Sequence, residues 1–110
     1  MHTCLIGNFC IDLIIRGVPR MPSWGQEVAG TDYMLVSSGQ TTYTAFALRA
    51  LGEPVSVIGC VGDDPWGRQI RADLEARGVD TGGLETVAAG RTALSVAAVR
   101  PDGERAFVSD

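Results

Sequence analysis

The sequence predicts an α/β fold in which helices flank a parallel sheet and a small second β-sheet stands apart from it. Two apolar runs, Thr3–Gly7 and Val55–Val61, are typical of strands buried in a parallel sheet. Helical patterns over Gln40–Leu51 and Pro65–Arg77 lie on either side of the second run. Strands that alternate with helices in this way favour right-handed crossovers. The remaining extended segments do not alternate with helices, so we expect them to pair outside the parallel sheet.

The chain between the first strand and the first helix is expected to be extended. Asp12 stands where the first strand should end, and Leu13–Ile15 continues without a helical pattern. Gly17–Gln26 contains two prolines and two glycines, which excludes regular structure and marks a surface connection. Glu27–Val36 is expected to form one or two strands of mixed polarity.

The first helix, Gln40–Leu51, carries little polar surface, so we expect it to be covered on most sides. Gly52 ends it, and Pro54 prevents it from resuming. Only two central strands are expected, which leaves the sheet with two bare edges and the helix with few packing partners. We therefore expect this chain to be one part of a larger domain.

The second helix has signals at both of its ends. The carboxylate of Asp64 can accept hydrogen bonds from free backbone amides, and Pro65 suits the first helical position. Gly78 supplies the left-handed residue that ends a helix. Asp63 and Asp64 together could hold a metal ion, but helix capping explains them with fewer assumptions. Apolar residues recur at i, i+4 and i+8 on one helix face: Trp66, Ile70 and Leu74.

The end of the chain predicts a β-hairpin. Thr92–Val99 is expected to be its first strand, and Arg105–Ser109 its second. Between them, Pro101–Gly103 is a turn with a physical basis, because proline presets one backbone dihedral and glycine accepts a positive φ.

Composition argues against several classes of partner. Of the 110 residues, 45% are hydrophobic and 20% are charged, as in ordinary globular domains. The net charge of -4, with no basic cluster, argues against a nucleic-acid partner. No apolar run approaches the roughly 18 residues that span a bilayer, so no membrane partner is expected either.

The cysteines predict neither disulfides nor a metal site. Cys4, Cys10 and Cys60 have no paired spacing, and the first and last of them lie in runs that predict buried strands. We expect reduced thiols in a cytoplasmic protein. The sequence has no Cys-x-x-Cys pair, and its only histidine is His2 near the terminus, so a zinc site is not expected.

Four motifs together resemble the N-terminal part of the ribokinase-like (PfkB) carbohydrate and nucleoside kinases. Their order and spacing match that family over nearly the whole chain, which would cover less than half of its domain. The motifs are Gly7–Asp12, Ser38–Gln40, Val61–Arg68 and Pro101–Arg105.

The resemblance implies a ribokinase-like, Rossmann-like sheet of which this chain is a partial domain. Residues 1–110 would be the N-terminal part of a single kinase domain. Within it, segments near 13–37 and 92–109 would form a small β-sheet lid over the sugar site. Lids of this family often pair between subunits, which makes a homodimer through the lid a candidate assembly.

Asp12 is the first candidate substrate-binding residue. The aspartate at this place in the family binds substrate hydroxyls, and the two carboxylate oxygens can accept hydrogen bonds from neighbouring hydroxyls. Its alternative role is to cap a backbone amide at a strand end. Cys10 lies two residues earlier and points the same way on an extended backbone, so we interpret it as lining the same pocket.

The segment before the first helix supplies the other candidates: Gly39, Gln40 and Tyr43. Many family members have a Gly-Gly pair here, and glycine lets the backbone approach a sugar closely. In this chain Ser38 replaces the first glycine, Gln40 an often basic position, and Tyr43 an asparagine. Tyr43 could stack on a substrate or bind it through its hydroxyl, or it could be a core residue. The Gln40 amide could bind a hydroxyl or cap the helix.

The chain lacks the motifs of other nucleotide-binding classes. It has no GxxxxGK[ST] phosphate loop, and the turn after the first strand is not a GxGxxG fingerprint. In the resembling kinases, ATP, Mg²⁺ and the catalytic aspartate belong to a Gly-x-Gly-Asp half that would follow Asp110. No catalytic residue and no cofactor or metal ligand is therefore assigned in these residues.

The resemblance implies that this chain is the N-terminal, substrate-binding part of an ATP-dependent sugar or nucleoside kinase, which transfers a phosphoryl group to a substrate hydroxyl. The alternative is a non-catalytic sugar-binding relative or pseudokinase fragment, which the altered segment from Ser38 to Tyr43 would favour. A third reading is a small independent α/β protein. A downstream Gly-x-Gly-Asp segment would favour the kinase, and cooperative unfolding of these residues alone would favour the third reading.

Overall fold

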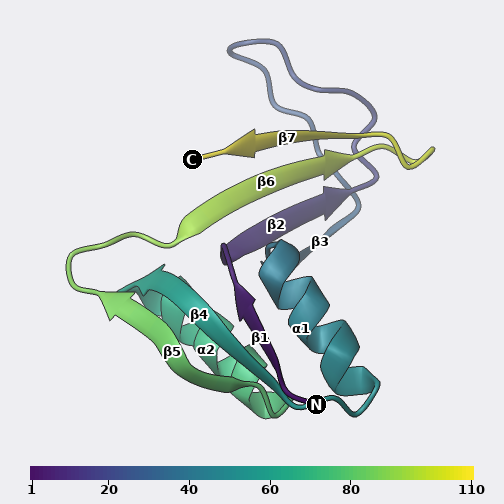
Figure 1. Ribbon diagram of the computed structural model, residues 1–110. Helices are drawn as coiled ribbons and strands as arrows, with labels where there is room; N and C mark the ends of the chain where they lie inside the picture. The colour runs from purple at the N-terminus through teal and green to yellow at the C-terminus, as the bar shows by residue number, and fades with distance from the viewer. The chain divides into compact units, whose positions relative to one another are not determined.

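Seven strands and two helices follow one another in the computed structural model, which describes residues 1–110. The chain divides into two compact units. The first unit comprises Met1–Ile11 and Ser37–Ala93, and the second comprises Asp12–Val36 and Leu94–Asp110. Each unit contains one β-sheet, and both helices belong to the first (Figure 1).

The first unit is built on a three-stranded parallel sheet with the strand order β1-β4-β5. Its strands are β1 (Thr3–Ile6), β4 (Val55–Gly62) and β5 (Asp80–Val87). Helix α1 (Gln40–Ala50) precedes β4, and α2 (Pro65–Ala76) connects β4 to β5. The predicted bounds of β1, β4 and both helices are confirmed to within one residue.

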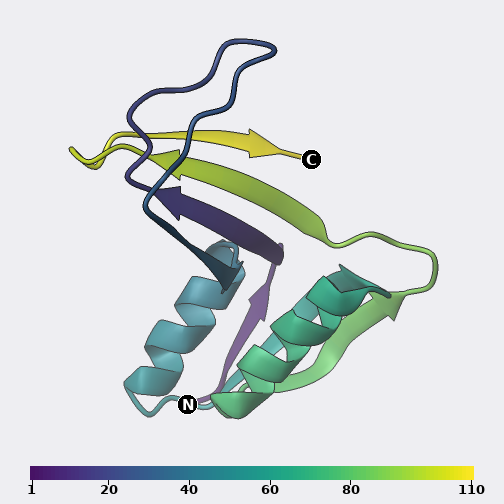
Figure 2. The same ribbon diagram turned by 180° about the vertical axis from the view of Figure 1, so that it is seen from behind.

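Both helices cover the same face of this sheet. They contact each other and both pack on β4, and Figure 2 shows α2 in front of β4 and β5. Right-handed crossovers that advance in one direction along a sheet place their helices on one side. The side chains of Val55, Val57 and Val61 point to that side and are buried. Against them pack Ile70 and Leu74 of α2, which have no exposed surface.

The other face of the sheet is uncovered in these residues, so the prediction that β4 is buried on both faces is wrong for them. Ile58 is 44% exposed, and Ile6, its partner on β1, is 77% exposed. Cys4 and Cys60 were predicted to be buried, but both are exposed. Strand side chains alternate between faces, so every second residue of β1 and β4 meets solvent.

Helix α1 is also less covered than its composition predicted. Only Thr41, Thr42 and Ala45 of this helix are buried. The remaining apolar surface, Tyr43 included, is half-buried or exposed. Helix α1 therefore rests on the sheet along one narrow stripe. Both α1 and α2 fall short of the length and apolarity that a membrane-spanning helix requires.

Strand β5 was not predicted, because Gly82 and Gly83 interrupt its apolar pattern and glycine weakens strand signals. Its pairing with β4 shifts register near Ile58. Arg71 of α2 also holds the strand, because its guanidinium donates to the backbone carbonyls of Thr81 and Leu84. Arg71 is therefore half-buried rather than free in solvent.

A hydrogen-bond network around Asp64 fixes the start of α2. Asp64 Oδ1 accepts from the backbone N–H of Gly67 at 2.8 Å, as the capping interpretation predicted. The same carboxylate accepts from the N–H and the hydroxyl of Thr92, each at 2.7 Å. The Thr92 hydroxyl in turn accepts from the N–H of Gly62, at the end of β4. The network thus joins β4, α2 and the segment that leads into β6 (Ala93–Val99).

The buried face of α2 differs from the predicted one at its first position. Trp66 was expected to face the core, but it is 37% exposed. Gly67 is buried in its place, and a Cβ there would lie 2.2 Å from the carbonyl oxygen of Gly62. The close approach of α2 to the end of β4 therefore requires a residue without a side chain at Gly67.

The second unit contains a four-stranded sheet with the order β3-β2-β6-β7. Strands β2 (Cys10–Arg16) and β3 (Asp32–Ser38) are joined by a long loop that projects beyond them (Figure 1). Strands β6 and β7 (Arg105–Ser109) form the predicted antiparallel hairpin, and Gly103 has the expected positive φ of 90°. An ion pair between Arg16 and Asp32 ties the end of β2 to the start of β3.

Removing the Asp64 carboxylate should destabilise the fold. We expect Asp64→Ala in the full-length protein to lower the free energy of unfolding by about 1–2 kcal/mol, because it uncaps α2 and leaves the buried Thr92 without its acceptor. Urea denaturation measures the change. Asp63→Ala is the matched control, because Asp63 makes only an exposed ion pair with Arg68 and should cost less than about 0.5 kcal/mol. Equal losses in the two variants would contradict the capping role.

The same carboxylate should make stability depend on pH. Burial has the largest single effect on the Asp64 pKa and raises it, but the hydrogen bonds from Thr92 and Gly67 together outweigh it and lower the pKa. A lowered pKa in the folded state stabilises the fold above the unfolded pKa of about 3.9, and this contribution is lost as pH falls through the folded value. Unfolding free energies of wild type and Asp64→Asn should therefore converge below about pH 4. A constant difference down to pH 2 would argue against this coupling.

Candidate functional site

The loop after β1 and the start of α1 fit closely together in the first unit. Gly39 has φ of 100°, a conformation that side chains disfavour. A Cβ on Gly39 would lie 2.6 Å from the carbonyl oxygen of Asn8 and 3.3 Å from the Cα of Phe9. Gly7 is also in a close contact, because a Cβ there would lie 2.1 Å from the hydroxyl of Thr41. These two glycines allow the end of β1 to meet the first turn of α1.

The first turn of α1 has no side-chain cap. Gly39 is its N-cap residue, and the turn closes with a hydrogen bond from the N–H of Tyr43 to the carbonyl of Gly39 at 3.1 Å. Gln40 is exposed and does not cap the helix, so this alternative role for its side chain is wrong. No acidic side chain lies in the turn. The turn therefore offers a ligand only uncharged hydrogen-bonding groups, among them its backbone amides and the side-chain amide of Gln40.

Tyr43 is held at this turn by a serine. Its side chain is 51% exposed, so its alternative role as a core residue is wrong for these residues. The hydroxyl of Ser38, at the end of β3, donates to the Tyr43 hydroxyl at 2.9 Å. Ser38 itself is buried. Two of the positions where the sequence departs from the resembling kinases, Ser38 and Tyr43, are therefore in direct contact.

Cys10 and Asp12 are the first and third residues of β2. Both side chains are half-buried, and Ile11 between them is buried on the opposite side of the strand. Asp12 was expected where the first strand ends. It instead lies inside the next strand, because a loop at Gly7–Phe9 separates β1 from β2. Cys10 belongs to the first unit, and Asp12 begins the second.

The structure thus gathers Gly39, Gln40 and Tyr43 at the start of α1, beside the Gly7–Phe9 loop. It keeps Cys10 and Asp12 together on β2, two residues apart. The Asp64 carboxylate accepts three protein hydrogen bonds, so it serves the helix start. No group of three or more His, Cys, Asp or Glu side chains is arranged to hold a metal ion.

Sequence reasoning missed one feature of the first unit. An open cavity of about 470 Å³ lies along the carboxyl ends of β1, β4 and β5. Asn8, Cys60, Arg91 and Thr92 are the lining residues with polar side chains. Ligands of open α/β sheets bind beyond the carboxyl ends of the strands, which is where this cavity lies. Arg91 was missed because β5, the strand before it, was not predicted.

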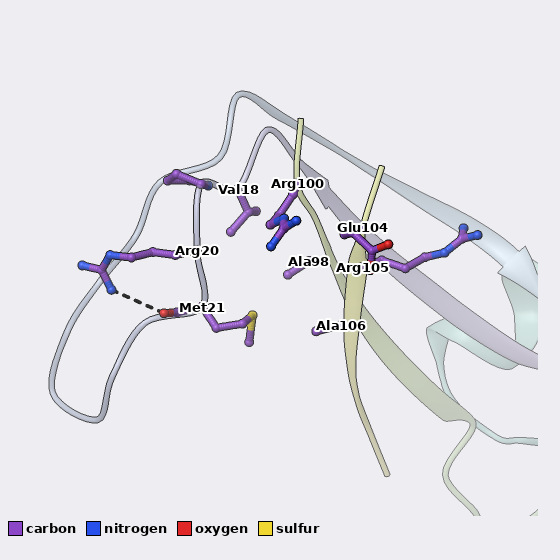
Figure 3. Close-up of a pocket in the computed structure, with 9 residues that line it drawn as sticks. Val18, Arg20, Met21, Ala98, Arg100, Glu104, Arg105 and Ala106 are labelled. Carbon is purple, nitrogen blue, oxygen red and sulfur yellow. Dashed lines mark hydrogen bonds between the residues drawn. The ribbon is translucent and has the colours of Figure 1, made fainter. Parts of the chain in front are cut away.

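The second unit has a smaller cavity of about 270 Å³ between the β2–β3 loop and the β6–β7 hairpin (Figure 3). Its floor is apolar, with Val18, Met21 and Ala98. Figure 3 shows the side chains of Arg20 and Arg105 extending away from one another, so their charges do not converge on one point. Arg100 and Glu104 also line this cavity.

A protein-family model described as "pfkB family carbohydrate kinase" matches residues 2–110. The chain belongs to this family. The match covers β1 to β7, including every candidate site residue, and so confirms the resemblance inferred from the four sequence motifs.

Curated relatives are sugar kinases that are much longer than this chain. Ribokinase of Bacillus subtilis is 38% identical over 86 residues, which are 78% of this chain and 29% of that protein. Fructokinase-1 of Oryza sativa subsp. japonica is 38% identical over 69% of the chain and 24% of its own length. ATP-dependent ribose-1-phosphate kinase of Halopiger xanaduensis is 36% identical over 94% of the chain and 35% of its own length. The chain therefore spans about a third or less of these relatives.

Solved structures confirm the fold class. A protein of Agrobacterium tumefaciens solved as a candidate ribokinase is 31% identical and matches with a TM-score of 0.88, over 99% of this chain and 35% of that one. Ribokinase from Cryptococcus neoformans var. grubii, solved with ADP, is 28% identical with a TM-score of 0.78, over 99% and 34%. The chain is thus a ribokinase-like α/β fold that corresponds to part of the domain in these proteins.

Replacing Gly39 should disrupt the contact between β1 and α1. We expect Gly39→Ala to lower the free energy of unfolding of the full-length protein by at least about 2 kcal/mol, because alanine disfavours φ of 100° and its Cβ would meet the backbone of Asn8. Gly82→Ala is the control. Its nearest neighbour would be the end of the Asp80 side chain at 3.2 Å, so the change should stay below about 1 kcal/mol. Equal effects in urea denaturation would refute the close approach.

Proposed function

We propose that this chain is the acceptor-binding part of an ATP-dependent kinase that phosphorylates a hydroxyl of a sugar or nucleoside. The family match over residues 2–110 carries the proposal, because every residue of the candidate site lies within it. Relatives named ribokinase, fructokinase and ribose-1-phosphate kinase support a sugar as the acceptor. The protein would be a cytoplasmic phosphotransferase with an alcohol group as acceptor.

The acceptor would be bound by residues of β2 and of the start of α1. Asp12 would accept hydrogen bonds from neighbouring sugar hydroxyls, and Cys10 would line the same side of β2. Gly39 would let the backbone approach the sugar, while Gln40 and Tyr43 would bind hydroxyls from the first turn of α1. These groups are mostly neutral, as expected for recognition of a polyol.

ATP and Mg²⁺ would bind outside these residues. No group of three or more His, Cys, Asp or Glu side chains in these residues is arranged for a metal ion, and the sequence has no phosphate loop. The ADP complex of the Cryptococcus neoformans var. grubii ribokinase supports nucleotide binding in the family. ATP would supply the transferred phosphoryl group, and Mg²⁺ would neutralise its charge.

The second unit would act as the lid of the site. Its sheet, with the long β2–β3 loop and the β6–β7 hairpin, would be the lid that the segments near 13–37 and 92–109 are proposed to form. A closed lid would exclude water, which competes with the sugar as phosphoryl acceptor. Pairing of two lids in a homodimer is the assembly we propose.

A non-catalytic sugar-binding protein is the second candidate function. Ser38 and Tyr43 favour it, because they replace the glycine and asparagine found in many family members. Incubation of the full-length protein with ATP, Mg²⁺ and a panel of sugars and nucleosides, followed by measurement of ADP, separates the two functions. Acceptor-dependent ADP production supports the kinase. Sugar binding in calorimetry without ADP production supports the binding protein.

Asp12 should be needed for acceptor binding. We expect Asp12→Asn in the full-length protein to lower kcat/KM for the sugar by about 10- to 100-fold, because hydrogen bonds to an ionised carboxylate contribute about 1.5–3 kcal/mol. Steady-state kinetics with varied sugar measure the loss. Asp32→Asn is the matched control, because this aspartate pairs with Arg16 at the surface of the second unit. Kinetics of Asp12→Asn equal to those of the control would reject the substrate role.

A further inference from the structure

The side-chain hydroxyls of Ser38 and Tyr43 form a hydrogen bond at the start of α1. Ser38 is 3% exposed and Tyr43 is 51% exposed, so the bond runs from a buried anchor to a solvent-facing ring. Their oxygens lie 2.9 Å apart. A half-exposed tyrosine ordinarily exchanges between rotamers, and a hydrogen bond from a fixed partner favours one of them.

The local backbone explains how the two side chains meet. Ser38 ends β3, and Gly39 turns the chain into α1 with φ of 100°. Tyr43 lies one turn into the helix, where long side chains lean toward the N-terminus. The ring therefore leans back over Gly39 toward the end of the strand. A side chain at position 39 would collide with Asn8, so this turn requires a glycine.

The pair leaves one group of Tyr43 for a ligand. A phenol has one donor proton and acceptor lone pairs. When Tyr43 accepts from Ser38, its own proton is directed away from the protein bond and can be donated to a ligand oxygen. The surrounding segment Ser37–Leu48 contains no charged residue, so a ligand here meets neutral hydrogen-bonding groups. A single neutral bond contributes about 0.5–1.5 kcal/mol, which sets the size of the expected effect.

We propose that Ser38 is a positioning residue for Tyr43, and that together they determine which sugar the site accepts. Tyr43 donates to one oxygen of the sugar, and Ser38 holds the phenol where that oxygen lies. The inference rests on the proposed kinase function. It assigns specificity to a serine that does not itself contact the sugar.

Deoxy analogues test the pair directly. The full-length protein is assayed with its best sugar and with analogues that each lack one hydroxyl. The analogue that lacks the hydroxyl bound by Tyr43 should have a kcat/KM about three- to tenfold below that of the sugar, because the phenol is left without its acceptor. We call this ratio the penalty of an analogue. In Tyr43→Phe, kcat/KM for the sugar itself should fall by a similar factor. The sugar and that analogue should then have nearly equal kcat/KM values. Penalties for the other analogues should not change.

Ser38→Ala distinguishes positioning from direct contact. Ser38→Ala should reduce, but not abolish, the penalty that disappears in Tyr43→Phe. The change should appear mainly as a higher KM for the sugar. The double variant Ser38→Ala/Tyr43→Phe should be no worse than Tyr43→Phe alone, because Ser38 acts through the phenol. Ser37→Ala is the matched control. Ser37 is the adjacent buried serine, and its hydroxyl donates to Asp73 at 2.6 Å, so its loss should lower stability and leave every penalty unchanged.

Each outcome decides one claim. If wild type phosphorylates sugars but all penalties persist in Tyr43→Phe and Ser38→Ala, the positioning role is overturned while the kinase function stands. If Ser38→Ala does not fold, Tyr43→Phe still tests the inference, because its half-exposed ring tolerates loss of the hydroxyl. The inference is overturned if all penalties persist in that variant. If wild type phosphorylates no sugar or nucleoside, the proposed function fails and the inference fails with it.

Discussion

The carboxylate of Asp64 is the point on which the first unit depends. It caps α2 through Gly67 and binds Thr92 twice, and Thr92 also accepts from the end of β4. The Asp64 carboxylate and the Thr92 hydroxyl together thereby satisfy polar groups from three segments that meet at the carboxyl edge of the sheet. Buried polar groups without partners are costly, so these segments are stable mainly as a set. At the same place α2 and the end of β4 pack closely, because a Cβ at Gly67 would lie 2.2 Å from the carbonyl oxygen of Gly62.

Sequence reasoning identified most of the elements because their signals are local. The cap at Asp64, the helix stop at Gly78 and the turn at Gly103 act through nearest neighbours in the chain. Strand β5 was missed because Gly82 and Gly83 remove its apolar pattern, and what stabilises it is the distant Arg71. Trp66 was misplaced because helical periodicity does not show that α2 approaches β4 closely enough to require glycine at the inner position.

The candidate site was predictable in its residues but not in their contacts. Motif resemblance pointed to Asp12, Gly39 and Tyr43, and the family match covers all of them. The contact between Ser38 and Tyr43 was not visible in the sequence, where the two residues looked like separate departures from the family pattern. In the structure the two departures are linked. Ser38, which stands in place of a glycine, is the hydrogen-bond partner of Tyr43, which stands in place of an asparagine. Pairwise geometry of this kind arises only once the strand end and the helix start are placed together.

The winding direction of the first unit constrains how its sheet can be enlarged. From β1 to β4 to β5 the crossovers advance one way, so α1 and α2 share one side and Ile6 and Ile58 face solvent on the other. Polypeptide that adds parallel strands beyond the free edge of β1 must advance the opposite way. With the same right-handed crossovers, its helices would then fall on the bare side. The reversal would occur at β1, whose carboxyl end adjoins the Gly7–Phe9 loop and the first turn of α1.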